Sequence, residues 1–422
     1  MSDGVGLLLR RAGFGPTAVE LAAARRAGYD AALSGLTAPP GPDVGATSAP
    51  VPDLGPDAYA GKRDLTYEEK VKLEDLRTAQ TEQITEWWLN RMTVASHQAV
   101  EKLVFFWHGH WATSVKKVRS PQLMLSQHRT LRSAPDFTVM ARRMVVDAAL
   151  NHYLDGHLNT RQAPNENLAR ELCELFLLGI GNYTEKDVKE AGRALTGWRF
   201  SLTRGRSVFD PEAHDPGRKT ILGRTANYGA QSLVDMLLTQ ESCPRFIATR
   251  LWFRYGSSTK PLPKTLQEKM VRAFPAPMAM LRLLLTDEAF QTTVGTMVKQ
   301  PVEWLVGALR QLGVRPASLT PEVRRAVLHD LENLGQLPFA PPNVGGWPSG
   351  GAWLTSAAAQ VRLRLAGRIA EQAPIDQLTP DSLAYLLGVD RWTNRTFAVL
   401  RSTQDRRQLL TLGLVSPEYL VT

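Results

Sequence analysis

The chain has 422 residues, of which 43% are hydrophobic and 22% charged, a composition typical of globular proteins. Lysine and arginine outnumber aspartate and glutamate by 50 to 41, giving a formal net charge of +9. The chain contains two cysteines, Cys173 and Cys243, and no CxxC pair, which argues against a disulfide framework and excludes a zinc ribbon. The basic residues are spread along the chain, a pattern that permits an acidic protein partner and does not favour nucleic acid.

The N-terminal region offers no targeting or membrane signal. Its apolar run, Val5 to Leu9, is too short for the hydrophobic part of a signal peptide. No stretch of about 18 apolar residues occurs, so no transmembrane segment is expected. These observations predict a cytoplasmic protein.

The first third of the chain divides into three expected parts. A helix over residues 16–36 is followed by a segment rich in Pro and Gly, residues 38–59, which predicts a loop. An amphipathic pattern over residues 65–97 predicts one long helix or two in series. We therefore expect an N-terminal helical segment (1–37), a linker (38–62) and a main helical domain (63–422).

Helical patterns continue through the rest of the chain. The aromatic run over residues 103–111 predicts a buried helix that ends near Gly109, and residues 136–153 predict an amphipathic helix. Residues 165–177 have strong helical propensity, and Thr184 with Asp187 resembles an N-cap pair. Few segments alternate with period two, so the predicted class is all-α with one possible β-hairpin near residues 200–221.

Two histidines, His108 and His110, lie inside this aromatic run. Imidazoles buried among Phe and Trp need polar partners, and imidazole is a common metal ligand. In an ideal helix, residues two apart point about 200° apart. A break at Gly109 would turn both rings toward one point. The alternative is a pair of core histidines bonded to backbone groups.

Acidic residues recur in the segment Asn165 to Glu174. Asn167, Glu171 and Glu174 form one helical stripe, and Glu166 and Arg170 form its neighbour. Carboxylates one turn apart repel unless a cation lies between them, and that cation could be Arg170 or a metal ion. The alternative is a solvated face with an Arg–Glu pair.

Other segments carry weaker signals. His214 lies in a polar loop and is a further candidate ligand, His128 is an open question, and His152 and His157 resemble surface residues. The segment from Pro341 to Leu354 is rich in Gly but is not a phosphate-binding loop. The run TRLWFRY, residues 249–255, fits core aromatics with arginines extending outward.

Several blocks in fixed order resemble a known family. They are LLLRRAGFGPT, LVFFWHGHWATS, APNENLARELCELFLLGIGNY, FDPEAHDPGRKTILG, PPNVGGWPSGGAWL and SPEYL. Together they resemble the bacterial family catalogued as a domain of unknown function, number eighteen hundred (DUF1800-like), from about Leu7 to Leu420. The family pattern often has a histidine where Ala163 stands. The family name implies no reaction, but these blocks contain the His and Glu residues selected above.

These patterns predict a metal-dependent oxidoreductase that acts on a peptide or small metabolite. The expected ligands are His108, His110, Glu171 and Glu174, with His214 as a further one. Mixed His and carboxylate ligands suit a divalent metal, with iron expected before manganese or zinc. Glu166 and Arg170 would act in catalysis by orienting the ligands. The alternatives are a metal-dependent hydrolase and a non-catalytic helical scaffold.

Overall fold

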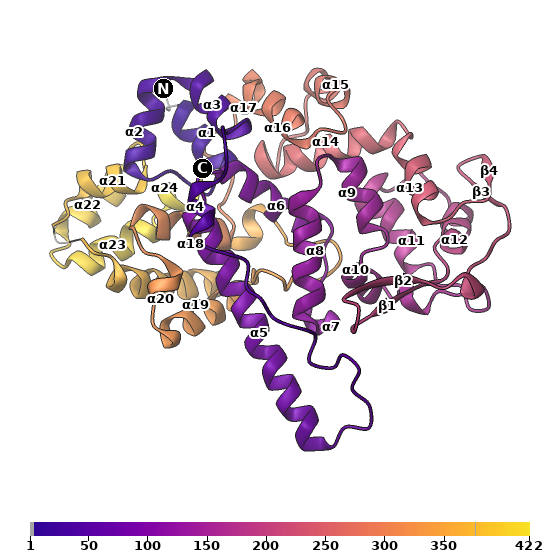
Figure 1. Cartoon of the computed structure of the whole chain (residues 1–422). Coiled ribbons are helices and arrows are strands. Elements are labelled where there is room, and N and C mark those ends of the chain that lie inside the picture. Colours follow the sequence, from indigo (N-terminus) through magenta and orange to yellow (C-terminus); the bar gives the residue numbers. More distant parts are fainter. Residues whose placement is uncertain (1–3, 376) are drawn as a thin grey trace.

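The computed structural model describes residues 4–375 and 377–422, and nearly all of its regular secondary structure is helical (Figure 1). The described residues form α-helices α1 to α24 and two small two-stranded antiparallel sheets. This confirms the predicted all-α class. Within the described ranges, no helix combines the length and the apolar character needed to cross a bilayer.

The helices alternate with short connections along the chain. The first twelve are α1 (Gly4–Ala12), α2 (Ala18–Ala27), α3 (Tyr29–Thr37), α4 (Val44–Thr47), α5 (Tyr67–Val94), α6 (Gln98–His110), α7 (Val115–Val118), α8 (Pro121–Ser133), α9 (Phe137–Met144), α10 (Ala148–Tyr153), α11 (Asn167–Glu171) and α12 (Glu185–Ala194). The others are α13 (Ala230–Leu238), α14 (Ser242–Tyr255), α15 (Lys264–Arg272), α16 (Pro277–Thr286), α17 (Glu288–Gln291), α18 (Pro301–Gln311), α19 (Pro321–Asn333), α20 (Ser356–Gln372), α21 (Pro380–Leu387), α22 (Asn394–Ser402), α23 (Arg406–Val415) and α24 (Pro417–Leu420). The 3-10 segments are η1 (Gly156–Leu158), η3 (Pro211–Ala213), η4 (Pro316–Ser318) and η5 (Gly350–Trp353), and η2 (Leu172–Leu177) is a π-helix.

Helix α5 is one continuous helix, the first of the two alternatives predicted for residues 65–97. Thr66 caps its N-terminus, and Glu69 completes a reciprocal capping box. Its first turns project from the body beside the mostly irregular 38–66 segment, which includes the short helix α4 (Figure 1). Its later turns are anchored by buried side chains such as Trp88 and Met92.

Several predicted elements differ from those observed. The helix expected over residues 16–36 is divided at Gly28, where α2 ends and α3 begins. The helix expected over residues 136–153 is divided, because Asp147 accepts a hydrogen bond from the Leu150 N–H and starts α10 as a new helix. Two hairpins replace the single expected one. Strand β1 (Trp198–Ser201) pairs with β2 (Arg206–Phe209), from Trp198 opposite Phe209 to Ser201 opposite Arg206. Strand β3 (Lys219–Ile221) pairs with β4 (Arg224–Ala226), with Lys219 opposite Ala226.

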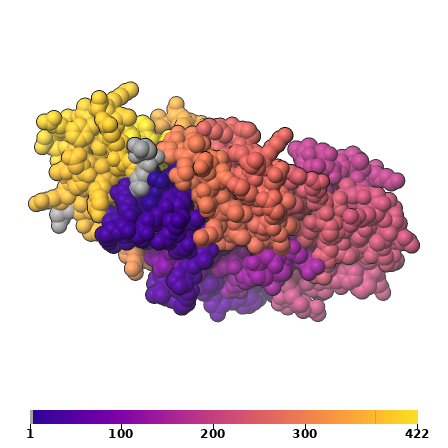
Figure 2. Space-filling model, turned by 90° about the horizontal axis from the view of Figure 1, so that it is seen from above, coloured from indigo at the N-terminus to yellow at the C-terminus, as the bar shows by residue number. Residues whose placement is uncertain are grey.

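Helix α6 lies between two hydrophobic cores. Phe106 and Trp107 pack in the core formed with α1, α9, α14 and α16, while Val104 and Phe105 pack in the core formed with α5, α18 and α20. A helix with large apolar side chains on opposite sides, as α6 has, is expected to be buried. The molecule is elongated, with the C-terminal helices at one end and the N-terminal helices against its middle (Figure 2). Helix α6 thus carries its two histidines into the interior.

Candidate active-site pocket

Gly109 has a different role from the one predicted. Helix α6 continues through it to His110, so no break occurs at Gly109. Instead, the glycine-rich segment after Pro341 crosses the helix at this point: a Cβ on Gly346 would lie 2.2 Å from the carbonyl oxygen of Gly109. Gly109 itself faces the ring of Trp347, whose Cε3 would lie 3.4 Å from an added Cβ. Glycine is therefore needed here for close approach.

Because the helix continues, the two histidine rings bind different partners. His108 Nε2 accepts a hydrogen bond from the Phe339 N–H at 3.0 Å. His110 Nε2 lies 2.9 Å from the carbonyl oxygen of Phe176 and donates to it. Burial lowers the pKa of each histidine to about 3, so both rings are neutral at physiological pH. The expectation that both rings face one point is corrected by this arrangement.

The predicted carboxylates differ in their surroundings. Glu174 accepts a hydrogen bond from the Tyr183 hydroxyl at 2.9 Å, and burial, with the charge of Glu174, raises the pKa of Glu171. Glu166 pairs with Arg170 at 3.5 Å, but the closer partner of Arg170 is Glu185 at 2.7 Å.

The remaining histidines have local partners or none. His214 Nδ1 lies within hydrogen-bonding distance of Thr196. His128 is buried against Trp87 and Trp88, and neither ring nitrogen has a partner within the described ranges. His152 and His157 are half-buried and stack 5.2 Å apart, which corrects their interpretation as surface residues. Across residues 4–375 and 377–422, no three His, Cys, Asp or Glu side chains form a group that could hold a metal ion.

His110 and Glu174 nevertheless line the same pocket. This cavity of about 520 Å³ lies between α6, η2 and α14, and its apolar wall includes Leu175, Phe246 and Val344. The helix predicted over residues 165–177 starts at Asn167 and changes to π geometry at Leu172. Such π segments are often found at functional sites. Here η2 supplies the Phe176 carbonyl that orients His110, together with the Glu174 side chain.

His110 keeps one ring nitrogen free. Since Nε2 carries the proton donated to Phe176, Nδ1 is the acceptor, and it is buried without a hydrogen-bond partner in the described part of the chain. The positive charge of Arg250 adds to burial in lowering the pKa of His110. A buried acceptor without a donor is costly, and this one belongs to a residue that lines the pocket.

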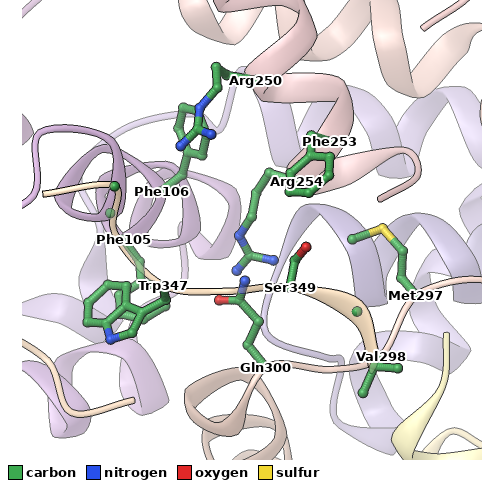
Figure 3. A pocket seen from close by; sticks show the side chains of 13 residues that line it. Phe105, Phe106, Arg250, Phe253, Arg254, Met297, Val298, Gln300, Trp347 and Ser349 are labelled. Atoms are coloured by element: carbon green, nitrogen blue, oxygen red, sulfur yellow. The ribbon is translucent and has the colours of Figure 1, made fainter. Parts of the chain in front are cut away.

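Helix α14 contributes two arginines to the walls of the cavities, and neither was predicted from the sequence as a site residue. Arg250 and Arg254, one turn apart, line a smaller cavity of about 60 Å³ that adjoins the first, since Arg250 and Gly345 line both (Figure 3). The run TRLWFRY contains the available signal: two arginines at helical spacing among aromatic residues. Trp347 and Ser349 of the glycine-rich segment line the smaller cavity, a role that its sequence did not reveal.

The fold and the pocket define an all-α protein with an arginine-rich cleft beside a buried histidine. Residues 7–421 match the family described as Protein of unknown function (DUF1800), and the chain belongs to that family. No curated protein and no solved structure matches the chain.

Proposed function

We propose that the protein is an enzyme whose active site is the pocket lined by His110 and Glu174, and that it acts on a small metabolite or a peptide. The observation that carries the proposal is the hydrogen bonding of the two ring nitrogens of His110. One ring nitrogen is fixed by a backbone carbonyl, the other is a buried acceptor without a partner among the described residues, and the residue itself lines a large cavity. This is how a residue that accepts a proton or a hydrogen bond from a substrate is held in place.

The neighbouring groups support this role. Tyr183 fixes the Glu174 carboxylate by a hydrogen bond, so the pocket holds a neutral imidazole and an oriented acid. Part of the low pKa of His110 comes from Arg250, after the larger effect of burial. A substrate anion placed beside Arg250 would offset that charge, raise the pKa of His110 and make it a better base when the pocket is filled.

A metal-dependent oxidoreductase is a second candidate, and one observation favours it. Metal-ligating histidines usually donate their other N–H to a carbonyl or carboxylate, as His110 does to Phe176. His110 and Glu174 would be two such ligands on one wall. We place it second because the described residues bring no third His, Cys, Asp or Glu to them.

The test is a depletion assay in a mixed metabolite extract, read by mass spectrometry. We expect wild type and His329→Gln, an exposed control on α19, to consume the same compound. His110→Gln and Glu174→Gln should not consume it, although the amide introduced by the second substitution could still accept the hydrogen bond from Tyr183. Consumption by His110→Gln at the wild-type rate, or no consumption by wild type, would overturn the proposal.

Elemental analysis of protein purified without chelators separates the alternatives. Stoichiometric iron that His110→Gln loses would favour the oxidoreductase, and zinc would favour the metal-dependent hydrolase. A protein that holds no metal and consumes nothing would be assigned to the scaffold class.

A further inference from the structure

The smaller cavity beside the proposed active site presents hydrogen-bond donors. Its polar side chains are Arg250, Arg254, Gln300 and Ser349, and no Asp or Glu of the described ranges lines it. Gln300 Oε1 already accepts from Gln336 at 2.7 Å, which leaves the Nε2 donor of Gln300 toward the cavity (Figure 3). A ligand that fills this space must therefore supply acceptors.

Two of these side chains, Arg250 and Arg254, each have a buried donor atom without a hydrogen-bond partner among the described residues. Arg254 has a side chain only 10% exposed and uses Nη1 to bind Glu303 at 3.0 Å. Its Nη2 is buried and has no partner within the described residues. Arg250 forms no ion pair with any described residue, and its Nε is likewise buried without a partner. Each orphaned donor carries a desolvation cost that an acceptor in the cavity would remove.

The local charges are also out of balance. Glu303 is the acidic partner of both Arg254 and Lys102, the latter at 2.5 Å. Burial alone would raise the pKa of Glu303, but the charges of Arg254 and Lys102 outweigh it and hold the pKa at about 2. Glu303 is therefore already ionised and shared by two cations. Arg250, one turn from Arg254, adds a third positive charge without an anion of its own.

The size of the cavity limits the anion. About 60 Å³ holds a few heavy atoms at most, so the smaller cavity fits a single charged group. The rest of the ligand must lie in the adjoining pocket of about 520 Å³, against the apolar side chains Leu175, Phe246 and Val344.

We propose that the substrate carries a carboxylate, which seats between Arg250 and Arg254, and an apolar portion, which lies in the larger pocket beside His110. This inference rests on the proposed function, because it names the substrate class of the same site. We favour a carboxylate over a phosphate for two reasons. Arg254 already uses Nη1 to bind Glu303, and two carboxylate oxygens match the two donors that lack a partner among the described residues, Arg250 Nε and Arg254 Nη2.

The test is isothermal titration with phenylacetate as the probe, compared with neutral phenylacetamide and with benzylphosphonate. We expect phenylacetate to bind at least about tenfold more tightly than phenylacetamide, the usual effect of a charge-assisted hydrogen bond. Equal binding of the amide would overturn the requirement for an anion. Tighter binding of benzylphosphonate would overturn the carboxylate assignment.

Variants locate the binding site. Arg250→Met should weaken phenylacetate binding by about tenfold or more, and Ser349→Ala by about threefold. Arg254→Met should also weaken it, but the loss of its bond to Glu303 could prevent folding, so Arg250→Met is the decisive variant. Unchanged binding by a folded Arg250→Met protein would place the probe elsewhere and overturn the inference.

Two readouts separate this inference from the proposed function. If metabolite consumption depends on His110 but phenylacetate does not bind, only the carboxylate inference fails. If phenylacetate binds through Arg250 but nothing is consumed, the site is a carboxylate-binding site and the enzymatic proposal fails. His110→Gln should retain phenylacetate affinity within about threefold, because the carboxylate is held by α14.

Discussion

Gly346 and Gly109 touch through their backbones, although 237 positions separate them along the chain. Gly346 has a φ of +82°, and a side-chain carbon on it would lie 2.2 Å from the carbonyl oxygen of Gly109. This contact holds the glycine-rich segment across the end of α6. It thereby places Gly345 and Trp347 in the walls of the two cavities.

Gly346→Ala should therefore destabilise the protein strongly. The left-handed backbone costs about 1 to 2 kcal/mol for alanine, and displacing the segment adds to that cost. The matched control is Gly351→Ala, where an added Cβ has open space. Thermal denaturation should show a large drop in melting temperature for the first variant and little change for the second. Similar melting temperatures for the two variants would contradict the close approach.

The two arginines of α14 should have opposite effects on stability. Arg250 is partly buried without an ion pair among the described residues, so Arg250→Met should leave stability unchanged or raise it by about 1 kcal/mol. Arg254→Met removes a buried partner of Glu303 and should lower stability by about 3 kcal/mol. Urea denaturation of both variants measures the difference. Equal losses would show that Arg250 is held by structural contacts and is not kept for a ligand.

The carboxylate of Glu303 should be far more sensitive than a surface one. Glu303→Gln leaves Lys102 and Arg254 without their shared anion and should cost about 3 to 5 kcal/mol. Glu332→Gln, which breaks the exposed pair with Lys116, should cost less than about 1 kcal/mol. Chemical denaturation of the two matched variants gives the comparison. A small effect for Glu303→Gln would mean that other groups neutralise these cations.

Acid should destabilise the fold through its buried histidines. The pKa of His108 and of His110 is about 3 in the folded protein because of burial, against about 6.5 in the unfolded chain. The unfolded chain therefore binds more protons between these values. The stabilising contribution is complete above pH 6.5 and is lost as the pH falls toward 3. At pH 5 each histidine should have lost about 2 kcal/mol.

Urea denaturation at pH 7 and pH 5 measures this effect. His108→Gln keeps an acceptor for the Phe339 N–H but cannot titrate, so the stability of this variant should fall less between the two pH values. The expected difference from wild type is about 2 kcal/mol. An identical pH dependence in wild type and variant would show that His108 is not buried in its neutral form.

Much of the fold could be predicted from local patterns. Helical periodicity, the N-cap pair of Thr184 and Asp187 and the apolar run of α6 are properties of neighbouring residues, and the structure bears them out. The division at Asp147 was missed because its neighbours continue the helical pattern, and only the capping bond reveals the boundary.

The arrangement of side chains at the candidate site depends on the tertiary structure. The sequence by itself marked His110 and Glu174 as candidate site residues, but it could not tell which way each side chain faces. For His110 that depends on whether α6 breaks at Gly109, where the helix instead continues and packs against Gly346, far along the chain. Likewise, Arg250 and Arg254 gain their importance from Glu303 and from the cavity beside them. Orientation, burial and charge balance arise only when distant segments pack together, so neighbouring residues alone do not encode them.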